Sequence, residues 1–294
     1  MNIKQDKPIT VAYQGIDGAY SQLACKTVFP DYPTLACENF QTAIQLVEKG
    51  KADFAMIPLE NSTAGRVEEI YRLLPKTHLH IIGEHFEPVN HCLLALPGIK
   101  LEQIKTVSSH PQALAQCFHR LDNLGITPLV AMDTALSAKD LASKKDSASL
   151  YGSHGAIASI LAAELYGLDV VAENFQDVVG NTTRFIVLAK NALEENVNPK
   201  QHYITSILFS VRNIPAALYK ALGGFATNGI NLIKLESYMD GGTMEASHFH
   251  IDIAGHHQQK SVRNALDELE FFGKEIRILG SYPAHKYRRK HEFV

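Results

Sequence analysis

The segment GNTTRFIVLAK, residues 180–190, joins a polar cluster directly to an apolar run. The hydroxyls of Thr182 and Thr183 and the guanidinium of Arg184 precede residues 185–189, whose apolar, β-branched character is typical of a buried strand. Burying such polar groups is unfavourable unless each finds a hydrogen-bonding partner. The segment therefore predicts a buried strand whose first residues meet polar groups, supplied either by the protein's own chain or by a ligand.

From Ile9 to about Lys190, short apolar runs alternate with amphipathic helical runs, which indicates a largely parallel α/β sheet. Two stretches, residues 84–98 and 172–185, are typical of a chain that crosses between two lobes. Segment 180–190 lies on the return crossing, so we expect it to border the cleft between the lobes. The predicted boundaries are 8–190 for the whole domain, 8–85 plus 180–190 for its first lobe, and 86–179 for its second lobe.

Ligands of open α/β sheets bind beyond the carboxyl ends of the strands, where helix N-termini offer unpaired amides. Pro58 is expected to end a strand shortly before a helix, which places Glu60, Asn61 and Ser62 at that edge. A plain helix cap by Asn61 or Ser62 is the alternative. Other polar residues at such junctions are Tyr20, Ser21, Ser109, His110, Asp133, Thr134, Ser153 and His154.

Local signals also predict element boundaries in the second lobe. Ser109 could cap a helix that has Pro111 in its first turn. We expect one helix over residues 110–121, a strand over 147–153 and a helix over 154–167.

Arg184 is the polar residue of the opening segment best suited to a ligand. An arginine that faces a cleft can hold a planar carboxylate by two parallel hydrogen bonds. We therefore consider Thr183 and Arg184 functional, with a structural hinge network as the alternative. The Gly15-x-x-Gly18 turn carries less information, because a tight turn and a backbone nest for an anion fit it equally.

The composition changes after Lys190. Residues 191–201 are polar and contain Pro199, which suits a linker, and residues 202–284 follow the order βαββαβ of the ferredoxin-like plan. On one strand of this second domain His248, His250 and Asp252 alternate with apolar residues. Such a row could bind a metal, but it is also what the polar face of an antiparallel sheet looks like, and we expect the latter.

Composition excludes several classes of function. The 294 residues carry a formal charge of −3, which gives no broad basic field for nucleic acid. The basic tail HKYRRKHEF, residues 285–293, is expected to be a solvated end. No apolar stretch reaches the roughly 18 residues that a membrane span needs. The start has no secretion signal, and the four dispersed cysteines are expected to be buried and reduced, so we expect a cytoplasmic protein.

Three motifs together make the chain similar to the bacterial prephenate dehydratases that carry a C-terminal ACT regulatory domain. GNTTRF contains the Thr-Arg-Phe signature of that family, PLENSTAGRV its Pro-x-Glu-Asn-Ser element, and SSHPQALAQC its Ser-His-Pro-Gln-Ala-x-x-Gln-Cys element. The similarity extends from YQGIDGAYS to ILGSYPAH, which is nearly the whole chain. It implies a two-lobed catalytic part that resembles periplasmic binding proteins, and conversion of prephenate to phenylpyruvate, water and carbon dioxide on the route to phenylalanine.

The resemblance also implies roles for individual residues. Thr183 would donate a hydrogen bond to the departing hydroxyl, Arg184 would hold a substrate carboxylate, and Phe185 would keep the region apolar. Glu60 would tune this network or carry a proton. The remaining substrate-binding residues would be Asn61, Ser62, Ser109, His110, Gln112 and Thr182.

The ACT part of this family binds phenylalanine through a Gly-Ala-Leu and a Glu-Ser-Arg-Pro element. Here the first has Ala216 in place of glycine, and the second lacks its arginine and proline. The expected effector contacts are Asn213, Ala217, Leu218, Glu236 and Ser237. The resemblance further implies a homodimer or homotetramer, and no metal or organic cofactor. An arogenate dehydratase and a non-catalytic amino-acid sensor are the alternatives.

Overall fold

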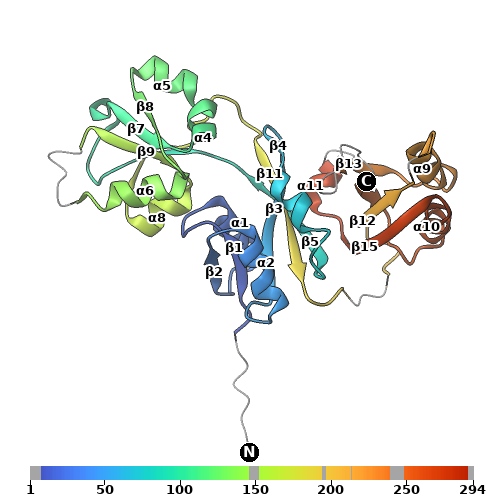
Figure 1. The fold of residues 1–294 in the computed structure, drawn as a ribbon. Coiled ribbons are helices and arrows are strands. Elements are labelled where there is room, and N and C mark those ends of the chain that lie inside the picture. The colour runs from blue at the N-terminus through green and yellow to red at the C-terminus, as the bar shows by residue number, and fades with distance from the viewer. Residues whose placement is uncertain (1–7, 146–151, 194–196, 213, 239–247, 291–294) are drawn as a thin grey trace, which may run out of the picture. The chain divides into compact units, whose positions relative to one another are not determined.

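The computed structural model describes residues 8–145, 152–193, 197–212, 214–238 and 248–290, and its strands form three sheets (Figure 1). The chain divides into two compact units. The first unit contains Met1–Ala43, Met56–Arg66 and Glu87–Phe185, and the second contains Ile44–Ala55, Val67–Phe86 and Ile186–Val294.

The first sheet has the strand order β2-β1-β3-β11-β5, with β4 paired to β3. Its strands are β1 (Val11–Gln14), β2 (Thr34–Cys37), β3 (Phe54–Asn61), β4 (Gly65–Arg66), β5 (His80–Pro88) and β11 (Thr182–Ala189). The helices in this part of the chain are α1 (Tyr20–Val28), α2 (Phe40–Glu48) and α3 (Glu68–Leu73). β1 and β2 are parallel, with Val11 opposite Thr34, as the predicted βαβ alternation requires.

The second sheet has the order β10-β6-β9-β7-β8. Its strands are β6 (Cys92–Ala95), β7 (Thr106–Ser109), β8 (Thr127–Val130), β9 (His154–Ala158) and β10 (Asp169–Ala172). Its helices are η1 (Leu101–Gln103), α4 (Pro111–Gln116), α5 (Phe118–Leu124), α6 (Thr134–Ala142) and α8 (Ile160–Tyr166). Alternate residues of β6 enter two different apolar clusters, so this sheet is buried on both faces.

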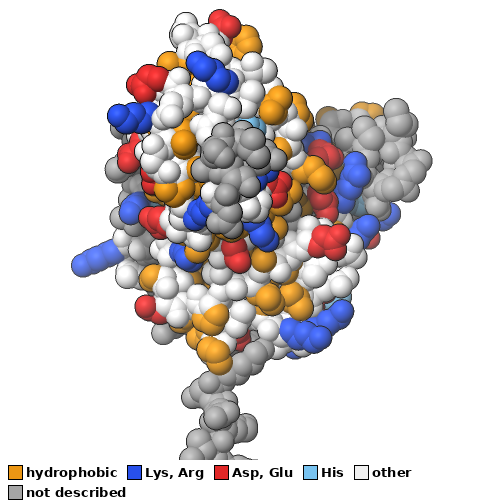
Figure 2. Space-filling model, turned by 90° about the vertical axis from the view of Figure 1, so that its left-hand side faces the viewer, with side chains coloured by type: hydrophobic (Ala, Val, Ile, Leu, Met, Phe, Trp, Pro, Cys, Tyr) orange, Lys and Arg blue, Asp and Glu red, His pale blue; other side chains and the backbone are white. Residues whose placement is uncertain are grey.

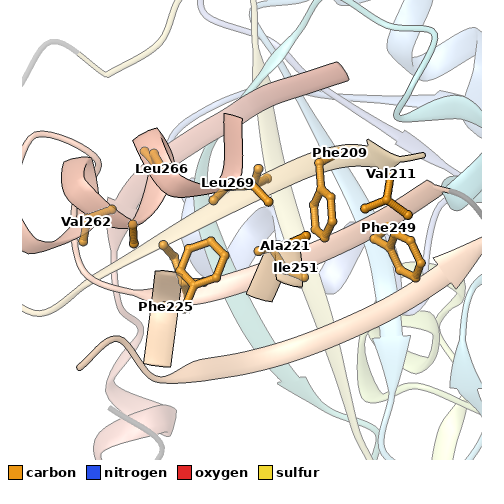
Figure 3. Packing of buried hydrophobic residues seen from close by; sticks show 12 residues of the cluster. Phe209, Val211, Ala221, Phe225, Phe249, Ile251, Val262, Leu266 and Leu269 are labelled. Carbon is orange, nitrogen blue, oxygen red and sulfur yellow. The ribbon is translucent and has the colours of Figure 1, made fainter. Parts of the chain in front are cut away.

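The third sheet has the order β13-β14-β12-β15 and carries helices on one face. Its elements are β12 (Tyr203–Val211), α9 (Ala217–Thr227), β13 (Leu232–Tyr238), β14 (His248–Ala254), α10 (Lys260–Phe272) and β15 (Gly273–Pro283), followed by α11 (Lys286–Lys290). Phe209, Phe249 and Ile251 from the strands pack against Phe225 and Leu269 from the helices (Figure 3).

The predicted fold class is therefore confirmed. The chain leaves the first sheet after β5, builds the second sheet, and returns through β11, which is the two-crossing plan expected of a two-lobed α/β domain. The third sheet has the ferredoxin-like order βαββαβ. The four cysteines are buried and free, as expected.

The strand around Pro58 is longer than predicted. β3 continues to Asn61, because Glu60 and Asn61 pair with Arg66 and Gly65 of β4 in a hairpin. The Asn61 side-chain oxygen accepts hydrogen bonds from the backbone N–H groups of Thr63 and Ala64, which closes this turn. Asn61 and Ser62 do not cap the next helix, since α3 begins after Val67 without a side-chain cap.

Boundaries in the second sheet differ as well. His110, not Ser109, caps α4, and the expected helix over 110–121 is interrupted at Cys117, between α4 and α5. Residues 154–158 are a strand and not the start of a helix, because a short apolar run does not distinguish the two by periodicity. Gly155 marks the close approach of this strand to β6: a Cβ there would lie 2.9 Å from the Leu94 carbonyl oxygen. Most of the strand expected over 147–153 lies outside the described residues.

The basic tail is not simply a solvated end. Arg288 is buried and donates to both carboxylate oxygens of Glu84 on β5, at 2.7 Å from Nε and 2.8 Å from Nη2. The Phe86 and Tyr287 rings stack beside this pair, with centroids 4.5 Å apart. The prediction rested on the rule that charged segments at chain ends are usually solvated. It was wrong for Arg288, because folding brings the buried Glu84 carboxylate, which is distant in sequence, into contact with it.

One face of the molecule shows how the other charges are distributed. Figure 2 shows acidic and basic side chains mixed with apolar ones on this face, without a broad field of one sign. Within the described residues, no helix is long and apolar enough to cross a membrane.

Removing the Arg288 guanidinium should destabilise the protein strongly, because the buried Glu84 carboxylate would lose its counter-ion. Arg288→Ala is expected to lower the free energy of unfolding by about 3–5 kcal/mol in urea denaturation. Lys286→Ala, an exposed position on the same helix, is the matched control and should change it by about 0.5 kcal/mol or less. Equal effects of the two substitutions would contradict the importance of the buried pair.

Candidate active site

The end of β3 and the beginning of β11 are joined by hydrogen bonds around Ser62 and Thr182, both in the first unit. The Ser62 backbone N–H donates to the Thr182 carbonyl at 2.9 Å, and the Ser62 hydroxyl oxygen accepts from the Thr182 N–H at 3.0 Å. The Thr182 hydroxyl turns back to the Gly180 carbonyl. These contacts fix the positions of the neighbouring side chains, Glu60 and Asn61 on one strand and Thr183 and Arg184 on the other.

The Thr183 hydroxyl is oriented by an amide. Asn61 Nδ2 donates to Thr183 Oγ1 at 2.9 Å and to Asn181 Oδ1 at 2.7 Å. Because an amide nitrogen can only donate, the Thr183 oxygen is the acceptor, and its own hydrogen remains available for another group. Thr183 is partly exposed, so a bound molecule can receive that hydrogen.

Arg184 forms an ion pair with Glu60, at 2.9 Å between Nη1 and Oε1. The Arg184 side chain is 2% exposed, whereas that of Glu60 is 33% exposed. Successive residues of a strand face opposite sides of the sheet, so Thr183 and Arg184 do not converge through being adjacent. Thr183 instead shares a face with Phe185, which is buried.

Asn181 and Gln116 extend the hydrogen-bond network from Thr183 to helix α4 of the second sheet. Asn181 Nδ2 donates to Gln116 Oε1 at 3.1 Å, and Gln116 Nε2 donates to Thr63 Oγ1 at 3.3 Å. We did not predict either residue as part of the site. Both stand inside or beside quoted motifs, Gln116 near the end of SSHPQALAQC and Asn181 in GNTTRF, so the motifs contained the signal.

His91 holds the far side of Gln116. Its Nε2 lies 2.8 Å from Gln116 Oε1 and its Nδ1 lies 2.9 Å from the Tyr20 hydroxyl. Since the Gln116 oxygen can only accept, the imidazole donates from Nε2, which leaves Nδ1 as an acceptor in the neutral ring. The single hydrogen of the Tyr20 hydroxyl is shared between His91 Nδ1 and the Asn90 carbonyl, which lies 2.8 Å from the hydroxyl oxygen. Burial lowers the pKa of His91, partly opposed by its hydrogen bond to Gln116, so the ring is neutral near pH 7. Burial also raises the pKa of Tyr20 well above its ordinary value, which keeps its hydroxyl protonated.

A family model described as prephenate dehydratase matches residues 11–193. A bifunctional N-acyl-homoserine lactone acylase/prephenate dehydratase from Komagataeibacter europaeus is 44% identical over 283 residues, covering 95% of this chain and 98% of that protein. The chain belongs to the prephenate dehydratase family.

Other members show the same relationship. Arogenate dehydratase/prephenate dehydratase 1, chloroplastic, from Arabidopsis thaliana is 43% identical over 294 residues, or 95% of this chain and 73% of that protein. The solved structure of prephenate dehydratase from Arthrobacter aurescens in complex with L-Phe matches with a TM-score of 0.83 and 30% identity, over 97% of this chain and 98% of that one. The structure of GqqA, described as a novel type of quorum quenching acylase, matches with a TM-score of 0.87 and 43% identity, over 95% and 100%.

The other family positions are more scattered. Ser109 is buried at the end of β7 and donates to the Ile157 carbonyl at 2.6 Å, whereas His110 and Gln112 are exposed at the start of α4. This segment reaches the Thr183 network through Gln116, the last residue of α4. Substrate contacts by Ser109, His110 and Gln112 stay predictions.

The expected effector positions lie in the second unit. Ala217 and Leu218 begin α9, and Glu236 and Ser237 lie on β13, while Asn213 is outside the described residues. His250 and Asp252 are buried on β14. The described residues contain no group of three or more His, Cys, Asp or Glu side chains that could hold a metal ion.

The depressed pKa of His91 predicts a pH effect on stability. The unfolded chain takes up this proton as the pH falls below about 6.5, before the folded protein does, so the stabilisation is present above that pH and lost below it. His91→Gln should reduce the acid slope of the free energy of unfolding by up to about 1.4 kcal/mol per pH unit. Urea denaturation of both proteins at several pH values between about 7.5 and 5.0 would measure this slope, because that range brackets the ordinary histidine pKa. The other histidines are present in both proteins and cancel in the difference, so parallel pH profiles would contradict the assignment.

Proposed function

We propose that this protein is a prephenate dehydratase, a carbon–oxygen lyase that converts prephenate to phenylpyruvate. The bond from the ring to its hydroxyl oxygen breaks with its electron pair, and the bond from the ring to the carboxylate carbon supplies a pair to the ring as carbon dioxide leaves. The ring becomes aromatic, which drives the reaction. The hydroxide that departs needs a proton or a strong hydrogen bond, and this is the help that the protein must give.

The observation that carries this proposal is the hydrogen bond from Asn61 to Thr183 Oγ1. It occupies the threonine oxygen as an acceptor and leaves its hydrogen to point at a substrate oxygen, so Thr183 assists the leaving group in the manner of a general acid. Asn61 is held in place by a chain of hydrogen bonds that runs through Asn181 and Gln116 to neutral His91. A threonine hydroxyl is a very weak acid, so partial donation with water as the final proton source fits better than full transfer.

Arg184 and Glu60 act as a pair in this proposal. The Glu60 carboxylate fixes the guanidinium, which is 2% exposed and faces the opposite side of the sheet from Thr183, so Arg184 supports the strand that carries Thr183 and does not share its contact with the departing hydroxyl. Phe185 keeps the surroundings of Thr183 apolar, which favours loss of the charge on the carboxylate that leaves as carbon dioxide. Substrate binding also involves Ser62 and Thr182, which set the alignment of the two strands.

Removal of the Thr183 hydroxyl tests the central role. Thr183→Ala is expected to lower kcat for phenylpyruvate formation by about 10²- to 10⁴-fold with a modest change in KM. Thr183→Ser keeps a hydroxyl and is the matched control, expected to retain most of the turnover. Near-normal kcat in Thr183→Ala would refute the role. No turnover by the wild-type protein would instead favour the alternative of a non-catalytic amino-acid sensor.

Arogenate is the competing substrate, because several relatives are named arogenate dehydratases. It differs from prephenate in carrying an amino group in place of the side-chain keto group. Parallel assays with both substrates, comparing kcat/KM, distinguish the two functions.

We further propose that the chain is organised as a catalytic domain over 8–190, a linker over 191–201 and an ACT domain over 202–284 that binds phenylalanine and inhibits the reaction. The ferredoxin-like element order and the Arthrobacter aurescens relative, whose structure is a complex with L-Phe, support this assignment. In the same proposal the protein is a cytoplasmic homodimer or homotetramer, and its chemistry uses no metal or organic cofactor.

Phenylalanine should therefore lower turnover, and this effect should depend on the start of α9. Leu218→Ala is expected to weaken inhibition by about tenfold or more while uninhibited kcat stays within about twofold. Leu222→Ala removes an equivalent side chain, one turn further along α9 and packed on the same core, and serves as the control. Equal inhibition of both variants would contradict the predicted effector site.

A further inference from the structure

A cavity of about 650 Å³ lies within the second unit, on the face of the third sheet opposite its helices. Phe209 and Val211 belong to the core under α9 and α10, so the intervening Ser210 faces the other way. The wall across from the sheet is formed by α3 and the residues directly after it, including Arg72 and Lys76. A volume of this size is in the range of small-molecule sites.

One row of side chains across all four strands forms the floor. Tyr238 on β13 is opposite His248 on β14, which is opposite Ser210 on β12, which is opposite Glu275 on β15. All four residues line the cavity. The Tyr238 and His248 rings lie against each other with centroids 5.5 Å apart, so the floor offers an aromatic surface at one end.

Among the described residues that line the cavity, the charged groups are mostly positive. Arg72, Lys76 and Arg277 line it, against the one carboxylate of Glu275 in this described part. Arg277 is held in position by hydrogen bonds from Nη1 to the Pro75 carbonyl and from Nη2 to the Leu79 carbonyl, each 3.3 Å long. Its guanidinium keeps further N–H groups for another acceptor. A half-buried arginine held by two backbone carbonyls, with two further cations lining the same cavity, is an arrangement that suits an anion.

The Ser210 hydroxyl gives an independent indication of a ligand. Ser210 is 4% exposed, and among the described residues its Oγ has no hydrogen-bonding partner. A buried hydroxyl without a partner is unfavourable by about 1–3 kcal/mol, so such groups normally meet a ligand or an ordered water. Ser210 stands in the middle of the floor, between the aromatic end at Tyr238 and the charged end at Glu275 and Arg277.

We propose that this cavity is a second small-molecule site, for an aromatic carboxylate of net negative charge. Its carboxylate meets Arg277, Arg72 and Lys76, its ring lies on the Tyr238–His248 end, and the Ser210 hydroxyl bonds to a polar atom between them. The site differs from the predicted effector contacts at the start of α9, because Ala217 and Leu218 pack with the core on the opposite face of the sheet. Binding at this site does not depend on the proposed reaction.

A fluorescent reporter within the cavity can test this site, with a second reporter near the expected effector contacts of α9 for comparison. The chain has no tryptophan, so Tyr238→Trp places a single indole on the cavity floor and preserves an aromatic surface. We expect 3-phenylpropionate, used as the probe, to change the emission of this variant saturably. The uncharged 3-phenylpropanamide and inorganic phosphate, which lack the charge and the ring respectively, should bind about tenfold more weakly or worse. Tyr219→Trp, exposed on α9, reports from outside the cavity and should not respond.

Charge removal then tests the proposed contacts in the same reporter background. Arg72→Gln with Lys76→Gln should weaken probe binding about tenfold, and both positions are exposed, so the fold should be retained. The control double variant, Lys260→Gln with Arg263→Gln, removes the same number of positive charges from exposed positions. These residues belong to α10, which packs on the opposite face of the sheet from the cavity, so binding should be unchanged. Ser210→Leu, which fills the cavity floor, should abolish binding. The proposal is overturned if the probe does not bind, if both double variants bind it equally, or if phosphate binds as tightly as the aromatic probe.

Discussion

The hydrogen bond that Asn61 donates to Thr183 is the interaction on which the catalytic interpretation depends. It exists because β3 runs past Pro58 to Asn61, and because Ser62 joins the end of that strand to the first residue of β11. One amide then closes the β3–β4 turn through its oxygen and orients a hydroxyl through its nitrogen. Asn61 therefore combines a structural and a chemical task in one side chain.

The network behind Thr183 consists of neutral groups, and physical chemistry explains why. Asn181 and Gln116 are held by several partners each, and His91 is kept neutral by its burial. Buried neutral groups lose less solvation energy than buried charges do, provided that each is hydrogen-bonded. Beside this network Glu60 and Arg184 form an ion pair, and the carboxylate of that pair is the end that water reaches. The region can thus approach a dianionic substrate without carrying an uncompensated charge of its own.

The two faces of the third sheet differ in polarity. Toward α9 and α10 it is apolar and closely packed, and on the other face it carries histidines, serines and charged side chains. Packing of the first face fixes the strand register, which in turn aligns Tyr238, His248, Ser210 and Glu275 in one row. The alternation of residues along β12 and β14 is what makes this face of the sheet the floor of the cavity.

The sequence by itself determined the class of the fold and the motifs of the site. Hydrophobic periodicity is local, so it was enough to predict the α/β alternation, the βαββαβ order after residue 202, and the buried strand after Arg184. It was not enough at positions 154–158, where a short apolar run fits strand and helix alike, nor at Asn61, where a turn competed with a helix cap. Only the tertiary structure paired Asn61 with Thr183, recruited Gln116 and His91, and gave Arg288 a buried carboxylate, because these partners are separated by 25 to 204 residues and meet through folding alone.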